Sequence, residues 1–166
     1  MTDSVAGEQN ATKELTEAEK RDNVIRLAFG GDPSRLEEFI QLIKDFVPEK
    51  TGVVLRGSAV TGYRWKDNAP FDADGPGTSD LDLTFVGHRI LEYYKATGFF
   101  VPGIHSRPIC DGDLHIAPDL LPLREKLMDM VKRPVNIQGT RDFVMYVRGE
   151  LLGQPYLTLV DKTGVD

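Results

Sequence analysis

Apolar residues recur at intervals of three and four positions in two segments of the chain, residues 36–46 and 120–131. This spacing predicts two helices, each with one apolar face that packs on a core. Asp32 and Pro33 precede the first segment as an N-cap and a first helical residue, and Pro134 ends the second. A shorter helix is expected over residues 89–96.

Alternation of apolar and polar residues predicts the central strand of the fold. Leu81, Leu83 and Phe85 alternate with polar residues, so one face of this strand is expected in a core and the other is polar. Apolar or β-branched runs predict further strands at residues 53–55, 135–138 and 156–160, and a brief strand is expected at residues 114–116. Residues 143–147 fit a strand, although residues 143–152 fit equally well a helix closed by Gly153.

Strands and helices are mixed along the whole chain, which favours an α/β or α+β fold with a mixed central sheet and helices packed on it. The length of 166 residues and the hydrophobic content of 40% fit one domain of this kind. Residues 1–21 are polar and are expected to form a flexible or marginally helical tail, with its helix beginning near Thr16. Residues 22–166 are then expected to form a single domain.

The charge balance narrows the classes of partner. The chain has 26 acidic and 20 basic residues, a net charge of -6, which offers no broad basic surface for duplex DNA or an anionic membrane. The single Cys110 cannot form an internal disulfide, and the N-terminus lacks the pattern of a signal peptide. No apolar run approaches the roughly 20 residues that span a bilayer. We therefore expect a cytoplasmic protein with no membrane association.

Two short motifs, each attached to an apolar strand, indicate the chemistry of the protein. Gly57 and Ser58 follow the strand at residues 53–55, and Asp80 and Asp82 belong to the central strand. Residues two apart on a strand project from the same face, about 6 to 7 Å apart along the backbone, so both carboxylates can reach one ion. A Gly-Ser turn or an Asp-x-Asp strand alone is commonly structural, but the two together favour a site.

The nature of the ligand follows from these residue types. Mg²⁺ takes oxygen ligands at about 2.0 to 2.1 Å and often uses one or two carboxylates while substrate phosphates supply the rest. Gly57 lets the main chain approach a phosphate, and the Ser58 hydroxyl adds a donor. Arg56, and either Arg64 or Lys66 from the following loop, are candidates to neutralise further phosphate charge.

Residues 66–89 contain five acids between Lys66 and Arg89 and no further base, so the strand carboxylates have no basic partner nearby in sequence. A bound cation is the simplest compensation. Tyr63 and Trp65 are candidates to stack on a base, although packing on their own domain is the commoner role of loop aromatics.

The Gly57-Ser58 turn and the run from Ser79 to Leu83 resemble the signature of the DNA polymerase β-like nucleotidyltransferase superfamily. In that family a strand leads into Gly-Ser, a short helix follows, and a second strand carries Asp-hydrophobic-Asp. The resemblance covers residues 53–87. It departs from the family in the separation of the motifs, since 80 minus 57 leaves a 23-residue step where the family commonly has a shorter one. The insertion, around residues 71–77, either closes over substrate or lies on the surface.

The resemblance implies a two-metal enzyme that moves a nucleoside monophosphate from an NTP such as ATP to an acceptor and releases pyrophosphate. Asp80 and Asp82 would hold Mg²⁺ or Mn²⁺, with two ions about 3.5 to 4 Å apart. A third carboxylate is expected from later in the chain, with Asp113 preferred over Asp111. The strand at residues 135–138 offers only the amides of Asn136 and Gln138, and an enzyme with either in the third position would be weakened or inactive.

Several functions therefore stay open. The alternative to the transferase is a catalytically silent member of the same fold that binds a nucleotide or a partner protein. A sugar-nucleotide glycosyltransferase is disfavoured by length, a calcium loop by Leu83 in its last ligand position, and zinc by the scattered histidines. The acceptor is expected to be an RNA, a protein or a small molecule, and a homodimer or a partner protein is expected to complete the site.

Overall fold

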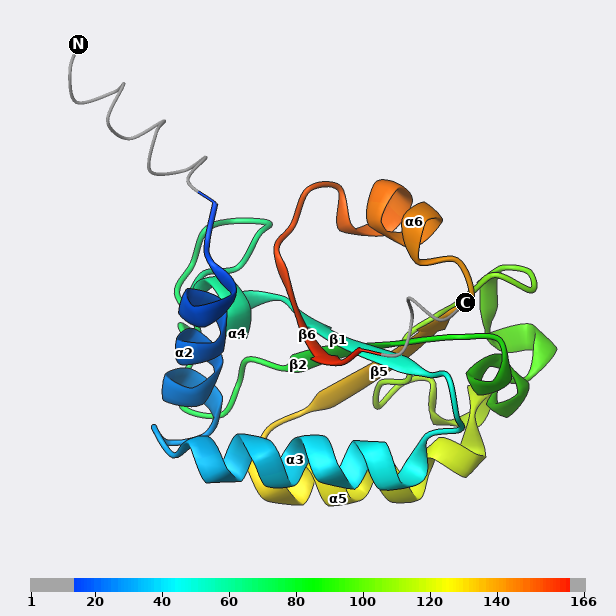
Figure 1. The fold of residues 1–166 in the computed structure, drawn as a ribbon, viewed down its shortest axis with the longest axis horizontal. Helices are drawn as coiled ribbons and strands as arrows, with labels where there is room; N and C mark the ends of the chain where they lie inside the picture. The colour runs from blue at the N-terminus through cyan, green and yellow to red at the C-terminus, as the bar shows by residue number, and fades with distance from the viewer. Residues whose placement is uncertain (1–13, 162–166) are drawn as a thin grey trace, which may run out of the picture.

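The structure, a computed structural model, describes residues 14–161 and is built on one six-stranded mixed sheet (Figure 1). The strand order is β3-β4-β5-β2-β1-β6. The strands are β1 (Gly52–Arg56), β2 (Leu81–Val86), β3 (Phe99–Val101), β4 (His105–Ser106), β5 (Val135–Thr140) and β6 (Tyr156–Val160). Strands β2 and β5 are parallel, whereas β1 pairs antiparallel with β2 and β6, and β4 antiparallel with β3 and β5. The expected mixed sheet with packed helices is confirmed.

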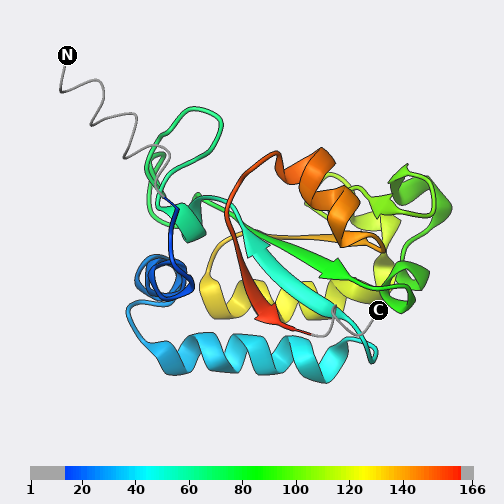
Figure 2. The same cartoon turned by 45° about the horizontal axis from the view of Figure 1, so that its top comes forward.

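Helices α3 (Pro33–Phe46) and α5 (Leu121–Val131) cover one face of the sheet (Figures 1 and 2). The side chain of Asp32 caps α3 by accepting from the backbone N–H of Ser34, and Pro33 is its first residue, as predicted. The core lies between these helices and the sheet. Its largest fully buried side chains include Phe39, Leu83 and Phe85.

Helix α2 (Glu17–Ala28) packs at one end of the sheet, against the one-turn helix α4 (Ser58–Thr61) (Figure 1). Thr16 and Glu19 form a capping box that begins α2. The boundary expected after residue 21 therefore falls inside this helix. Residues 1–13 of the expected tail lie outside the described residues.

The opposite face of the sheet is covered in part by α6 (Phe143–Tyr146), which continues as the π-helical turn η5 (Val147–Leu151) (Figure 2). This settles the choice left open for residues 143–152 in favour of a helix. Tyr146 is fully buried, and its hydroxyl lies 2.7 Å from that of Thr84. This face of the sheet therefore has a polar layer beneath α6, in contrast to the apolar core on the other side.

Short 3-10 helices make up the connection between β2 and α5: η1 (Arg89–Tyr93), η2 (Ala96–Gly98), η3 (Leu114–Ile116) and η4 (Pro118–Leu120). The prediction of a strand at residues 114–116 is wrong, because these residues form η3 and bury Ile116. Ile109 instead bridges Ile137 of β5. Within residues 14–161, no helix is both long and apolar enough to cross a membrane.

Candidate functional site

Three polar side chains form a row across the ends of the three central strands, on the face of the sheet away from α3 and α5. Arg56 of β1 is the register partner of Asp82 in β2, and Asp82 is the partner of Asn136 in β5. Because side chains alternate along a strand, the core takes Leu81 and Leu83 and leaves Asp82 on the polar face. The sheet register thus brings together an arginine, a carboxylate and an amide that are far apart in sequence.

The two carboxylates of the motif meet at one nitrogen atom. Nδ2 of Asn136 donates to Oδ2 of Asp80 at 2.7 Å and to Oδ1 of Asp82 at 3.1 Å. Asp80 and Asp82 therefore converge on a common point, as the Asp-x-Asp spacing predicts.

Gly57 brings the backbone directly over this pair of carboxylates. Its φ is +99°, and a Cβ built on it would lie 3.2 Å from Oδ2 of Asp82. Only glycine adopts this backbone conformation readily, and a side chain here would crowd the Asp82 carboxylate. Ser58 follows as the first residue of α4 and is buried. The Gly-Ser turn and the Asp-x-Asp strand are therefore parts of one site.

The surroundings of Asp82 oppose its negative charge. Burial raises the pKa of the Asp82 carboxyl, and the neighbouring Asp80 carboxylate raises it further. Arg56 and the hydrogen bond from Asn136 act in the opposite direction but do not cancel the effect. A bound cation would relieve the repulsion between the two carboxylates.

Arg56 extends from the carboxylates toward the polar layer under α6. Burial raises the pKa of the Tyr146 hydroxyl, and the charge of Arg56 partly opposes this. The Nε atom of Arg56 is buried and has no hydrogen-bond partner among the described residues. Of the three bases considered from sequence, Arg56 is the one that the strand register places beside Asp82.

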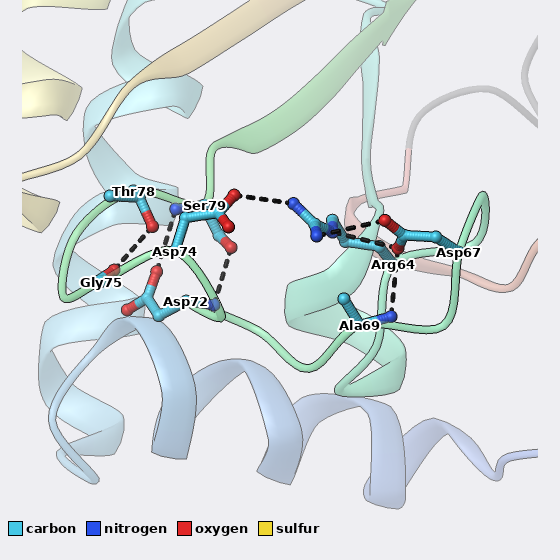
Figure 3. A network of polar contacts seen from close by, with 8 residues as sticks. All are labelled: Arg64, Asp67, Ala69, Asp72, Asp74, Gly75, Thr78 and Ser79. Atoms are coloured by element: carbon cyan, nitrogen blue, oxygen red, sulfur yellow. Dashed lines mark hydrogen bonds and ion pairs between the residues drawn. The ribbon is translucent and has the colours of Figure 1, made fainter.

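The whole loop between the two motifs, residues 63–78, is called the inserted loop below and is held by its own charges (Figure 3). Arg64 forms ion pairs with Asp67 at 3.2 Å and Asp74 at 3.0 Å. The carboxylate of Asp72 accepts hydrogen bonds from the backbone N–H groups of Gly77 and Ser79. Arg64 is therefore engaged within the loop.

A second arginine fastens the same loop to the domain. Arg133, just before β5, contacts Asp72 at 2.7 Å, donates to the carbonyl of Ser79 at 2.8 Å, and stacks on Phe71 at 4.5 Å. This pairing lowers the pKa of Asp72 to about 2. Three of the five acids between Lys66 and Arg89 are thus paired with arginines in the structure, whereas Asp80 and Asp82 share the amide of Asn136.

The structure does not bring Asp113 or Asp111 to this pair. Asp113 precedes η3 and lies 3.3 Å from Arg107, and Asp111 lies 2.9 Å from Arg124. Among residues 14–161, no three His, Cys, Asp or Glu side chains gather where they could hold a metal. The position next to Asp82 on the parallel strand is taken by Asn136, the amide that sequence reasoning regarded as a poor substitute.

Lys20 is a basic residue near the site that sequence reasoning missed. Its side chain is only 13% exposed, and Nζ lies 5.6 Å from the ring centroid of Tyr156, the register partner of Arg56. The helix expected to begin near Thr16 includes Lys20, and the Thr16–Glu19 capping box is the sequence signal that strengthens this helix. Tyr63 and Trp65 remain 53% and 58% exposed on the inserted loop.

The residues of the site fit a hard divalent cation. Two carboxylates and an amide are the ligand types that suit Mg²⁺ or Mn²⁺, and such an ion commonly takes its remaining oxygens from substrate phosphates. Comparison of the chain with protein-family models, curated proteins and solved structures finds no significant match.

Proposed function

We propose that this protein binds a nucleoside triphosphate with Mg²⁺ or Mn²⁺ and transfers its nucleoside monophosphate to an acceptor hydroxyl, with release of pyrophosphate. The observation that carries the proposal is the convergence of Asp80 and Asp82 on one point beneath the backbone of Gly57. The likeness of these two motifs to those of the polymerase β-like nucleotidyltransferases supports it.

Each residue has a distinct part in this function. Asp80 and Asp82 hold the cation, which neutralises the phosphates as charge develops on them. Gly57 lets the phosphates approach the main chain, and Arg56 adds a fixed positive charge beside Asp82. The acceptor oxygen forms a bond to the α-phosphorus as the bond to the bridging oxygen of pyrophosphate breaks, and the proton of the acceptor hydroxyl passes to solvent.

The proposal is tested by comparing the wild type with the double variant Asp80→Asn plus Asp82→Asn. Each α-labelled NTP is supplied with Mg²⁺ or Mn²⁺, and RNA, protein and small-molecule acceptors are offered in turn. We expect label transfer and pyrophosphate release by the wild type and loss of both in the double variant, because the variant cannot hold the cation.

The matched control is Asp119→Asn plus Asp129→Asn, which makes the same change of charge at two exposed positions. This control should retain wild-type transfer. Equal transfer by the wild type and the Asp80 and Asp82 double variant would contradict the proposal. Absence of both NTP binding and transfer in the wild type would contradict it as well.

Asn136 favours a second candidate, a nucleotide-binding protein without transferase activity. This neutral amide is the register partner of Asp82, where a further carboxylate would assist a second ion. NTP binding that depends on Asp82, without turnover over hours, would support this candidate. Any turnover that is lost in Asp82→Asn would rule it out.

A further inference from the structure

Asn136 lies at the point where a cation would bridge the two carboxylates. Its Nδ2 atom is within hydrogen-bond distance of both Asp80 and Asp82. Ionised carboxylates only accept hydrogen bonds, so the amide must present its NH₂ group, with one hydrogen for each neighbour. A neutral side chain thus holds two like charges together in the structure.

The side chain of Asn136 also carries an amide oxygen, which can act as a metal ligand. Turning the amide about its last torsion exchanges nitrogen and oxygen without moving the backbone, and this torsion is soft. Amide oxygens suit hard cations such as Mg²⁺ and Mn²⁺, whereas an NH₂ group has hydrogens pointing at the site. A cation between Asp80 and Asp82 therefore favours the turned amide.

The charge of the site limits how many divalent ions it can hold. Asp80 and Asp82 bring two negative charges, Asn136 brings none, and Arg56 places a positive charge across the strand from Asp82. Two divalent ions about 3.5 to 4 Å apart repel each other strongly and need more anionic ligands from the protein than this row supplies.

We propose that Asn136 is a reversible amide ligand that limits the site to one divalent cation. This rests on the proposed function, because the cation enters with the nucleoside triphosphate. Without the cation, Nδ2 of Asn136 pairs with both carboxylates; with it, Oδ1 replaces Nδ2 and becomes the third protein ligand.

The number of ions is tested by counting Mn²⁺ bound per chain, by electron paramagnetic resonance, at saturating non-hydrolysable ATP analogue. We expect one ion for the wild type and two for Asn136→Asp, in which a third carboxylate replaces the amide. Gln41→Glu, at an exposed position of α3 in the other layer of the fold, adds the same charge and should keep one ion. Two ions in the wild type, or one in a folded Asn136→Asp protein, would overturn the inference.

The variant Asn136→Ala distinguishes an amide that binds the ion from an amide with a purely structural role. If the amide binds the ion, its removal weakens Mn²⁺ affinity, by about 10- to 100-fold. If it only stabilises the pair of carboxylates in the absence of metal, its removal strengthens Mn²⁺ binding, and that result would overturn the ligand role. Thermal unfolding of each variant checks that it is folded.

The outcomes distinguish this inference from the function on which it rests. Failure of Mn²⁺ and the ATP analogue to bind at Asp80 and Asp82 overturns the proposed function and the inference together. Binding that disappears in Asp80→Asn plus Asp82→Asn, but with two ions per wild-type chain, overturns the inference alone.

Discussion

At the scale of single residues, Asp82 is a carboxylate whose ionisation the folded protein opposes. Its pKa is raised above the ordinary value of 3.8, chiefly by burial and then by Asp80. Between the two pKa values the folded state holds more protons than the unfolded chain, so the free energy of unfolding falls as the pH rises through this window.

Asp82→Asn should therefore stabilise the protein at neutral pH, because it removes a buried charge that costs stability there. The advantage over the wild type is expected to shrink as the pH falls from the raised pKa of the folded state toward 3.8, and to vanish below it, where Asp82 is protonated in both states. Chemical denaturation at a series of pH values measures it, with Asp119→Asn as an exposed control. A variant less stable than the wild type at neutral pH would contradict this account.

Gly57→Ala tests the close approach of the backbone to Asp82. The backbone conformation of Gly57 is strained for other residues, and the added Cβ would press on a carboxylate oxygen at 3.2 Å. We expect a loss of about 1 to 3 kcal/mol in the free energy of unfolding, together with weaker NTP binding.

Gly149→Ala is the matched control for this substitution. Gly149 lies in η5, and beyond its own helical turn no atom lies within 4 Å of the position that a Cβ would take, so alanine should be accommodated there without loss. Similar losses in the two variants would show that the Gly57 turn has no special constraint.

At the scale of elements, the inserted loop depends on one ion pair with a residue outside it. Asp72 has a pKa lowered to about 2, first by its hydrogen bond with Arg133, so its stabilising effect is present above pH 3.8 and is lost as the pH falls toward 2. Asp72→Asn should cost about 1 to 2 kcal/mol at neutral pH and nothing near pH 2.

Urea titrations at neutral and acidic pH measure this change. Asp74→Asn is the control, because Asp74 pairs with Arg64 at an exposed position of the same loop and should contribute less than about 1 kcal/mol. Equal losses in the two variants would argue against a specific role for Arg133.

The elements that sequence predicts well are those with a clear repeat. The alternation around Leu83 identifies β2, and Asp32 and Pro33 mark the start of α3. The prediction for residues 114–116 was wrong, because three residues fit either a strand or a helical turn, and here they form a turn that buries Ile116. The ion pair that anchors the inserted loop could not be predicted from local sequence patterns, since Asp72 and Arg133 are 61 residues apart.

The site was predictable where its motifs are local. Gly57, Ser58, Asp80 and Asp82 lie together as expected from their order in the chain. The third position was predicted only as a choice between Asp113, Asp111 and the amides of residues 135–138, because the parallel pairing of β2 with β5 decides which residue faces Asp82, and that register is a property of the sheet. The search for a third carboxylate therefore favoured Asp113, whereas the sheet supplies Asn136.

At the scale of the whole molecule, the site lies where the ends of four strands meet, at the edge of the sheet that these strand ends form. The end of β1 and the beginnings of β2, β5 and β6 lie at this edge, because β2 is parallel to β5 and β1 is antiparallel to its neighbours. Helix α2 closes the same edge by packing on α4 (Figure 1).

Asn23→Ala tests the support that α2 gives to the site. Nδ2 of Asn23 donates to the carbonyl of Val60 in α4 at 2.8 Å, so α2 holds the helix that follows the Gly57 turn. We expect a loss of about 1 kcal/mol in stability and a weaker affinity for NTP, measured by calorimetry.

The control for this variant is Gln41→Ala, which removes an exposed hydrogen bond to Asp45 on α3, in another part of the fold. It should leave NTP affinity unchanged. Unchanged affinity in Asn23→Ala as well would mean that α2 and the site are independent.

The exposed Trp65 has a practical consequence for all these experiments. It is the single tryptophan of the chain and lies on the inserted loop. Its neighbour in sequence, Arg64, forms ion pairs with Asp67 and Asp74 of the same loop. The fluorescence emission of Trp65 therefore comes from one known position, and its wavelength responds to exclusion of water from that position. An unlabelled protein thus carries its own optical signal for any ligand that covers the loop.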